Sequence, residues 1–425
     1  MNRMLDLCSF GIQPDDTLVQ TDAIQKAFDS LAAGGGGTLY VPKGTFCSGA
    51  LMVPHGVNLT IDGTLKGSAD IKDYPIRETR YEGRTALWPD ALLNVIDAEH
   101  FVLDGTGSLD GNGIPFYAEF WKKREEAIEA GRPFVNHDVP RPRLLYVAHG
   151  RNITIRNVHL VNSGFWNIHL YDCEQVVVEG VTVTSPHGPV RAASTDGIDL
   201  DASRHVVVRD CTFSVDDDCI CLKGGKGPDA HLVNPPTSDI LVERCTVGFG
   251  HGVVTFGSEA CRVSDVTIRD MNVTGENQLV RFKFREDTDQ LFERIRFEQI
   301  TMQDGWVFSI RPWISRQDEV LGKGLPSVIR GLVVQDVTAT DVKSPGVILA
   351  DPPQTVVEGL EIRRVRITTA KGGDASLSRH DRFEETEHAD PHHLSIKGVG
   401  SCTMEEVWID GAKIPYQGNQ CVDTH

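Results

Sequence analysis

Four short polar sequences in the middle of the chain bring together the side-chain types that most often do acid–base chemistry. They are STDG at 194–197, DDDC at 216–219, GHG at 250–252 and RFK at 281–283. The spacing is 22 residues from Asp196 to Asp218, then 33 to His251, then 30 to Arg281. Near-regular spacing of this size is typical of a solenoid, in which successive repeats carry successive motifs.

Three carboxylates, on Asp196, Asp217 and Asp218, would lie together if these repeats stack. Like charges at such close range cannot all ionise freely, so one carboxyl stays protonated near neutral pH while another stays ionised. Glycosidic bond cleavage requires this combination: an acid protonates the leaving oxygen and a carboxylate activates water. Arg281 and Lys283 alternate with a phenylalanine, so both should point to one side of a strand and suit a substrate carboxylate.

A repeated strand pattern must position these residues. Beyond residue 50, short alternating segments recur with starts 23 to 37 residues apart, each reading as strand, one or two polar residues, then strand. Helical signals between these segments are missing, which argues against βαβ units. The segments are NITIRNVHL (152–160), QVVVEGVTV (175–183), HVVVRDCTF (205–213), DILVERCTV (239–247), DVTIRDMNV (265–273), RIRFEQITM (294–302), GLVVQDVTA (331–339) and GLEIRRVRI (359–367).

We therefore predict an all-β fold, a right-handed parallel β-helix with an N-terminal capping helix. Stacked coils would share a continuous core that a single coil cannot form. Because neighbouring strands lie about 4.8 Å apart, the four motifs should occupy one face of successive coils. Residues 1–50 are expected to form the cap segment and residues 51–425 the catalytic domain.

The capping helix is predicted over residues 21–33, where Ile24, Ala27, Phe28 and Leu31 fall on one face. Thr21 can cap its start, and the glycines at 34–37 end it. That glycine run follows the helix, whereas phosphate-binding loops precede one, so a phosphate site is not expected there.

Two segments interrupt the repeats. Residues 113–140 are helix-like, aromatic and charged, and we interpret them as a lobe rising from the coils. Residues 371–393 are polar and could be a metal cluster, but their spacing fits no standard ligand pattern. A solvated loop is the better interpretation. Its acidic and histidine residues are Glu384, Glu385, Glu387, His388, Asp390, His392 and His393.

Taken in order, the four motifs resemble the family-28 glycoside hydrolases, the polygalacturonases and rhamnogalacturonan hydrolases. The family pattern is NTDG, a DD pair often followed by Cys, then GHG, then RIK. The N-terminal FG…AIQKAFD…GGGTLYVPKGTF also resembles the opening of that family. Here Ser194 stands in place of the usual Asn and Phe282 in place of the usual Ile. A family tyrosine that lines the sugar site has no evident match, and Trp313 lies about where it would fall.

The resemblance implies an inverting hydrolase of galacturonate-containing pectic chains. Asp217 would be the general acid, Asp196 and Asp218 would hold and activate water, and His251 would tune the acid. Arg281 and Lys283 would bind galacturonate carboxylates. Lys223, in CLKGGKG, could bind another uronate or simply be solvated, and Trp166, Trp121 and Trp313 could be sugar platforms or core aromatics.

The lobe at 113–140 could wall off one end of the substrate cleft, in which case the enzyme would act from chain ends. The alternative is that it covers an apolar coil face far from the site. Two other functions remain open for such a fold: a pectate lyase, which binds calcium through carboxylates, and a non-catalytic glycan-binding β-helix. GHG and RFK favour hydrolysis over elimination, and the full set of acidic positions argues against mere binding.

The composition of the chain limits which classes of partner it is expected to bind. The chain has 60 acidic against 42 basic residues, a net charge of −18, which disfavours nucleic acid and anionic membranes as partners. No apolar run is long enough to span a membrane, and no cofactor or metal is expected. The N-terminal MNRMLDLCSFG lacks an apolar signal core, so the protein would be secreted or periplasmic if a leader was removed and cytoplasmic otherwise. Ten cysteines leave disulfides possible.

Overall fold

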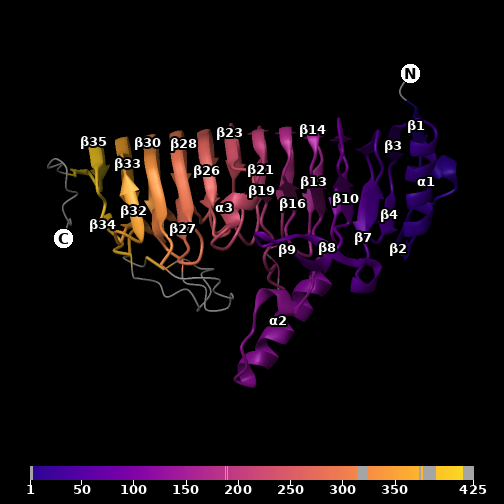
Figure 1. Cartoon of the computed structure of the whole chain (residues 1–425), viewed down its shortest axis with the longest axis horizontal. Coiled ribbons are helices and arrows are strands. Elements are labelled where there is room, and N and C mark those ends of the chain that lie inside the picture. Colours follow the sequence, from indigo (N-terminus) through magenta and orange to yellow (C-terminus); the bar gives the residue numbers. More distant parts are fainter. Residues whose placement is uncertain are drawn as a thin grey trace. The chain divides into compact units, whose positions relative to one another are not determined.

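The computed structural model describes residues 3–186, 188, 190–313, 324–372, 375–376 and 389–414. It contains two compact units, one of residues 1–199 with 203–217 and the other of residues 200–202 with 218–425. Within each unit the strands run parallel in rows, so that successive coils add one strand to each row (Figure 1). The predicted right-handed parallel β-helix is confirmed.

In unit 1 the chain passes repeatedly through three rows, as in β14, β15 and β16 of a single coil. The first row contains β1 (Met4–Asp6), β3 (Gly37–Val41), β6 (Val57–Ile61), β11 (Val102–Asp104), β14 (Arg151–Arg156), β17 (Glu174–Glu179) and β20 (Arg204–Arg209). The second contains β2 (Asp15–Val19), β4 (Thr45–Ser48), β7 (Thr64–Gly67), β12 (Ser108–Asp110), β15 (His159–Val161), β18 (Thr182–Thr184) and β21 (Thr212–Ser214). The third contains β5 (Leu51–Val53), β10 (Leu93–Ile96), β13 (Leu145–Ala148) and β16 (Ile168–Tyr171), and β19 (Ile198–Asp201) follows in the chain.

In unit 2 the first two rows merge into long bent strands, while the third row stays separate. The third row contains β22 (Ile220–Lys223), β25 (Val254–Phe256), β27 (Gln278–Phe284), β29 (Trp306–Pro312), β31 (Ser344–Leu349) and β34 (Ser395–Lys397). The merged rows contain β23 (Thr237–Glu243), β24 (Thr246–Val247), β26 (Arg262–Val273), β28 (Gln290–Gln303), β30 (Ser327–Val342), β32 (Thr355–Glu358), β33 (Leu360–Thr369), β35 (Cys402–Ile409) and the antiparallel β36 (Ala412–Lys413).

The polar residues between paired strands form the corners of the coils. Asn157 and Asp210, which follow β14 and β20, have φ of 64° and 54°, and Gly180, which follows β17, has φ of 63°. This left-handed conformation is most accessible to Gly, Asn and Asp. The same conformation recurs in unit 2 at Arg244, Asp270, Gln299, Asp336 and Arg364.

Parallel register stacks like residues above one another inside the coils. Ile153 pairs with Val176, which pairs with Val206, and all three are buried. Such apolar ladders supply the core that the alternating segments predict.

Beyond the first coil, insertions in unit 1 are confined to one corner, between the second and third rows. There lie the 3-10 helix η2 (Ile71–Asp73) and the hairpin β8 (Ile76–Tyr81) with β9 (Arg84–Pro89). The predicted lobe lies one coil later, as α2 (Ile114–Glu129) and η3 (Asn136–Asp138), and α2 projects away from the strands (Figure 1). The sequence pattern predicted the helix but missed the hairpin.

The helix α1 (Thr21–Ala33) covers the first coil of unit 1 and buries Ile24, Ala27, Phe28 and Leu31, as predicted. Thr21 is not its cap: the helix begins at Thr21, whose Oγ1 accepts a hydrogen bond from the Gly49 N–H at 2.7 Å. The hydroxyl is engaged by the coil, so it anchors the helix to the strands instead.

The nine cysteines within the described residues are all free thiols. Of the polar segment 371–393, Glu384, Glu385, Glu387 and His388 lie outside the described residues; His393 Nδ1 lies 3.0 Å from Asp390 Oδ1, with both side chains exposed. None of the helices in the described part of the chain has the length and apolarity that a membrane span needs.

Removing the apolar face of the cap should expose one end of the unit 1 core. We expect Phe28→Ala to lower the free energy of unfolding by about 3–5 kcal/mol, because a fully buried ring is lost. Lys26→Ala, on the exposed face of the same helix, should stay within about 0.5 kcal/mol of the natural protein. Urea unfolding followed by circular dichroism checks both; equal midpoints for the two variants would contradict the capping role.

Candidate active site

Unit 1 joins two of the acidic motifs through a backbone contact. The N–H of Asp216 donates to Thr195 Oγ1 at 3.2 Å, and both residues are buried. Asp196 and Asp217 each directly follow one of the two residues that this hydrogen bond joins. Asp217 is the more exposed of the two, being half-buried, and it is bonded through the next peptide to Asp218.

The Asp196 backbone is held by a residue that the motifs do not include. Asn167, fully buried at the start of β16, donates its N–H to Asp196 O at 2.9 Å. Its side-chain amide also donates to Asp196 O at 3.1 Å and to Thr195 O at 3.2 Å. Two donors on one side chain thus fix the turn that carries the first aspartate.

The lobe reaches this part of unit 1. Trp121 of α2 donates its indole N–H to Arg191 O at 2.6 Å, and the Arg191 guanidinium lies 5.2 Å from the Trp121 ring. Arg191 Nε in turn lies 3.3 Å from the buried carboxylate of Asp216. The lobe therefore lies next to the acidic motifs and not on a distant coil face.

In unit 2, Asp218 lies in a cradle of donors and is 1% exposed. Arg281 Nη1 donates to its Oδ1 at 2.5 Å, and Lys283 Nζ donates to its Oδ2 at 2.8 Å. Thr255 Oγ1, one strand before Arg281 in register, donates to Oδ1 at 2.7 Å. The carboxylate thus accepts hydrogen bonds from two cations and a hydroxyl.

Electrostatics fixes the protonation state of this group. Burial by itself would raise the pKa of Asp218, but Arg281 and Lys283, together with His251, lower it well below its usual range. Asp218 is therefore an ionised carboxylate near neutral pH. Such a group can accept a proton or orient a water molecule, but it cannot serve as the general acid.

The GHG motif makes room for this cradle. A Cβ built on Gly252 would lie 2.1 Å from Thr255 Oγ1 and 2.8 Å from Asp218 Oδ1, so no larger residue fits. The Gly252 carbonyl also accepts the N–H of Cys219 at 2.8 Å. His251 lies beside it, with its own carbonyl held by Gln278 Nε2 at 2.9 Å. The second glycine is thus needed for close approach of the chain to the carboxylate.

The RFK strand alternates as predicted. Phe282 points into the core, stacked on Phe256 with ring centroids 4.2 Å apart, while Arg281 and Lys283 point to the other side. Trp313 lies over this pair, with its ring 4.5 Å from Lys283 Nζ and 5.8 Å from the Arg281 guanidinium carbon. An aromatic face beside two cations is suited to a sugar that carries a carboxylate.

Lys223 lies in a second buried charge cluster of unit 2 that sequence analysis missed. Its Nζ donates to Glu259 Oε2 at 3.1 Å, and its side chain is 5% exposed. Burial would raise the pKa of Glu259, but Lys223, Arg285 and Lys226 lower it. Arg285 also forms a two-pronged pair with Asp287 at 2.8 and 2.7 Å. The predicted uronate contact of Lys223 would therefore be made by a paired cation.

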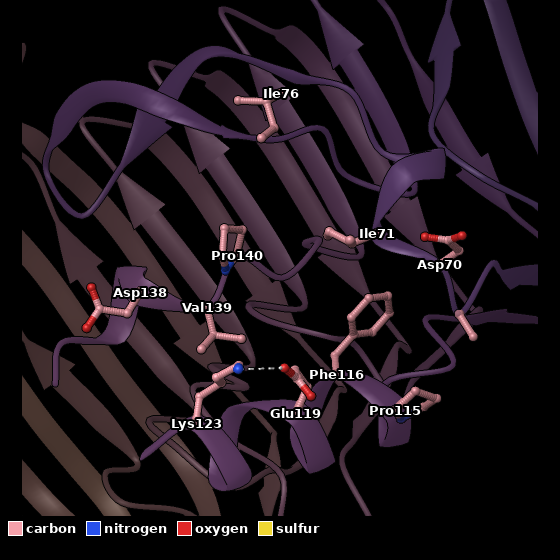
Figure 2. Close-up of a pocket in the computed structure, with 11 residues that line it drawn as sticks. Asp70, Ile71, Ile76, Pro115, Phe116, Glu119, Lys123, Asp138, Val139 and Pro140 are labelled. Carbon is pink, nitrogen blue, oxygen red and sulfur yellow. Dashed lines mark ion pairs between the residues drawn. The ribbon is translucent and has the colours of Figure 1, made fainter. Parts of the chain in front are cut away.

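A cavity of about 650 Å³ lies elsewhere in unit 1, between the first turns of α2 and the coil (Figure 2). Its wall is largely apolar, and Lys123, the one basic residue among those that line it, is 3.7 Å from Glu119. Asp70 and Asp138 add further negative charge. This cavity does not suit an anionic sugar, and none of the predicted site residues lines it.

Three residues contact the site but were not found from sequence: Asn167, Thr255 and Arg141. Asn167 directly precedes an apolar strand, and a buried amide at such a position is a usable signal. Nothing in the sequence distinguishes Thr255 from other strand threonines; only the strand register places it beside Arg281. Arg141 directly follows the charged residues of the lobe, and nothing in its local sequence distinguishes it from them.

Comparison with known proteins agrees with this geometry. The family described as glycosyl hydrolases family 28 matches residues 34–372. A probable polygalacturonase of Vitis vinifera is 25% identical over 383 residues, covering 86% of this chain and 74% of the relative. An exopolygalacturonase of Zea mays is 26% identical over 311 residues, covering 70% and 67%.

The fold has a solved counterpart as well. A hyperthermoactive exopolygalacturonase from Thermotoga maritima superposes with a TM-score of 0.80 at 23% identity, covering 100% of this chain and 96% of that chain. Because the family match spans most of the chain and the motifs occur in order, this protein belongs to the glycosyl hydrolases family 28.

Proposed function

We propose that the protein hydrolyses α-glycosidic bonds between galacturonate units of pectic chains, with inversion at the anomeric carbon. The observation that carries the proposal is the pairing of Asp218 with Arg281 and Lys283. It supplies a carboxylate that is ionised near neutral pH, directly after a half-buried aspartate in the chain. It also supplies positive charge in a protein whose net charge is −18.

In the proposed reaction Asp217 gives its proton to the leaving glycosidic oxygen. Asp196 and Asp218 hold a water molecule on the opposite face of the sugar, and one of them takes its proton as the oxygen attacks. Asp217 suits the acid role because it is more exposed than Asp218, so it can reach a leaving oxygen, whereas Asp218 is held ionised by its cation pairs. His251 would help to set the proton affinity of the acid.

Substrate recognition follows from the local charge. Arg281 and Lys283 together carry two positive charges and Asp218 one negative charge, so the group keeps a net charge of +1. A galacturonate carboxylate would neutralise it, and the Trp313 ring would stack on the sugar. Lys223 remains a candidate for a further uronate, shared with Glu259.

Chain-end action is the finer part of the proposal. The supporting observation is that α2 contacts Arg191 through Trp121, and Arg191 lies three residues before Ser194, the first residue of the STDG turn. A wall beside the acidic motifs would stop a polymer from passing through the cleft. The similar proteins from Zea mays and Thermotoga maritima are both exopolygalacturonases.

The reaction is tested on polygalacturonate and on rhamnogalacturonan I by proton NMR of the first product. We expect new reducing ends on polygalacturonate, an inverted anomer and no ultraviolet-absorbing unsaturated sugar. Asp217→Asn should lower kcat by about 10²–10⁴-fold, since the acid is lost without change of volume. A retained anomer, an unsaturated product, or an Asn variant above a few per cent of natural activity would each refute the proposed mechanism.

The ion pairs of Asp218 predict a shift in the pH profile. Lys283→Met removes one of the two cations that depress the pKa of Asp218, so that pKa should rise. The base would then be protonated at a higher pH, and the acid limb of kcat/KM should move upward. Lys371→Met, at an exposed lysine, is the control. An acid limb shared by all three proteins would show that Asp218 is not the titrating base.

A time course on polygalacturonate separates chain-end from internal cleavage. We expect only monomers or dimers early, with a slow fall in viscosity. Trp121→Ala, which loosens the lobe, should increase the share of longer early products, whereas Ile128→Ala on the exposed side of α2 should not. A rapid loss of viscosity with mixed oligomers from the natural enzyme would rule out chain-end action.

A further inference from the structure

The residue that begins the STDG turn has an unusual backbone conformation. Ser194 has φ of 55°, in the left-handed region. Asn and Asp occupy this region more readily than other non-glycine residues, whereas serine has no such preference. Ser194 is the one serine or threonine with positive φ among the residues that the structure describes. Because Asp196 follows two residues later, this φ sets where its carboxylate points.

A contact from the lobe holds Ser194 in place. Ser194 Oγ donates to Asn136 Oδ1 at 3.1 Å, and Asn136 belongs to η3 at the end of the lobe. The Asn136 amide nitrogen donates in the other direction, to Glu82 Oε1 in the hairpin turn at 3.3 Å. Asn136 therefore links two insertions to the turn that carries Asp196.

Arg141 also contacts Asn136 and the start of the STDG turn. Its Nη2 donates to Asn136 Oδ1 at 2.5 Å and its Nη1 donates to Ala193 O at 2.5 Å. Ser194 Oγ lies 3.5 Å from Nη2. One planar guanidinium thus contacts the Asn136 side chain and both residues that lead into the STDG turn.

Burial makes this guanidinium rigid. Arg141 is 0% exposed and lies between the rings of Phe120 and Phe165, at 4.1 and 4.9 Å from their centroids. Its hydrogen-bond acceptors within the described part of the chain are neutral oxygens, the fourth being Val139 O at 3.3 Å. Burial lowers the pKa of Arg141 to about 10, so it stays charged at neutral pH. A buried charge that binds only neutral oxygens is held by geometry, not by ion pairing.

We propose that Asn136 and Arg141 are positioning residues that keep Ser194 in the left-handed conformation and thereby aim Asp196. The lobe is then part of the catalytic machinery and does more than wall the cleft. This inference rests on the proposed function, in which Asp196 holds the attacking water. Neither residue touches the reacting atoms.

The test removes the Asn136 contact and then restores the conformation by another route. Asn136→Ala, at a half-buried position, should lower kcat on polygalacturonate about 10- to 100-fold with KM and Tm nearly unchanged, since a small displacement of a reacting group has that effect. In the double variant Asn136→Ala with Ser194→Asn, asparagine adopts positive φ readily. We expect it to recover most of the lost kcat.

Asn58→Ala is the matched control. Asn58 Oδ1 accepts the Val102 N–H at 2.8 Å in the first row, so its loss removes a comparable amide contact away from the turn. It should change Tm without changing kcat. If Asn136→Ala does not fold, Asn136→Ser, which keeps one polar group, takes its place with the same expected order of rates.

The outcomes separate this inference from the function on which it rests. If the natural enzyme does not cleave polygalacturonate, or if Asp196→Asn is fully active, the proposed function fails. If Asp196→Asn is inactive but Asn136→Ala keeps natural kcat, the positioning role is overturned. A loss of kcat that Ser194→Asn does not restore overturns it as well, because the effect would not pass through the Ser194 backbone.

Discussion

The parallel register between strands of successive coils determines which side chains of the candidate site lie next to one another. Each strand of the third row in unit 2 hydrogen-bonds to the next at matched positions, so Thr255 lies beside Arg281. That single alignment puts a hydroxyl and a guanidinium on the same oxygen of Asp218. A slip of one residue would turn Phe282 toward the carboxylate and Arg281 into the core. The stacked apolar ladders therefore secure the geometry of the candidate site as well as the stability of the coils.

The charges of the site follow from the same stacking. A buried carboxylate is costly unless cations and donors surround it. Two consecutive outward positions of β27 supply both cations, and Gly252 supplies the space. The buried carboxylate of Glu259 is likewise surrounded by two cations, Lys223 and Arg285, in the same unit. The acidic surface of the protein thus contains local sites at which positive charge is fixed in place.

Much of this arrangement could be predicted from sequence, because period and alternation are local properties. The coils, the cap helix, the opposite orientations of Phe282 and its neighbours, and the helical lobe all follow from short patterns. The hairpin at 76–89 was missed because IRETRY carries charges on both faces and shows no strand alternation of its own. Thr21 and Lys223 show a different limit. Their side chains contact Gly49 and Glu259, which lie far along the chain, and no local pattern encodes such partners.

Arg141 shows the same limit, since its acceptor Ala193 O lies 52 residues downstream. The position of the lobe, which supplies Asn136, shows why the fold tolerates a site that depends on contacts between residues far apart in the chain. Beyond the first coil, the insertions of unit 1 emerge from the corner between the second and third rows, while the other corners stay tight. The turn that carries Asp196 lies at that same corner. Chain length is therefore free to vary at the corner that carries Asp196 and is constrained where coils must stack. A lineage with this architecture can remodel the entrance to its active site by small steps, each of which leaves the register of the coils unchanged.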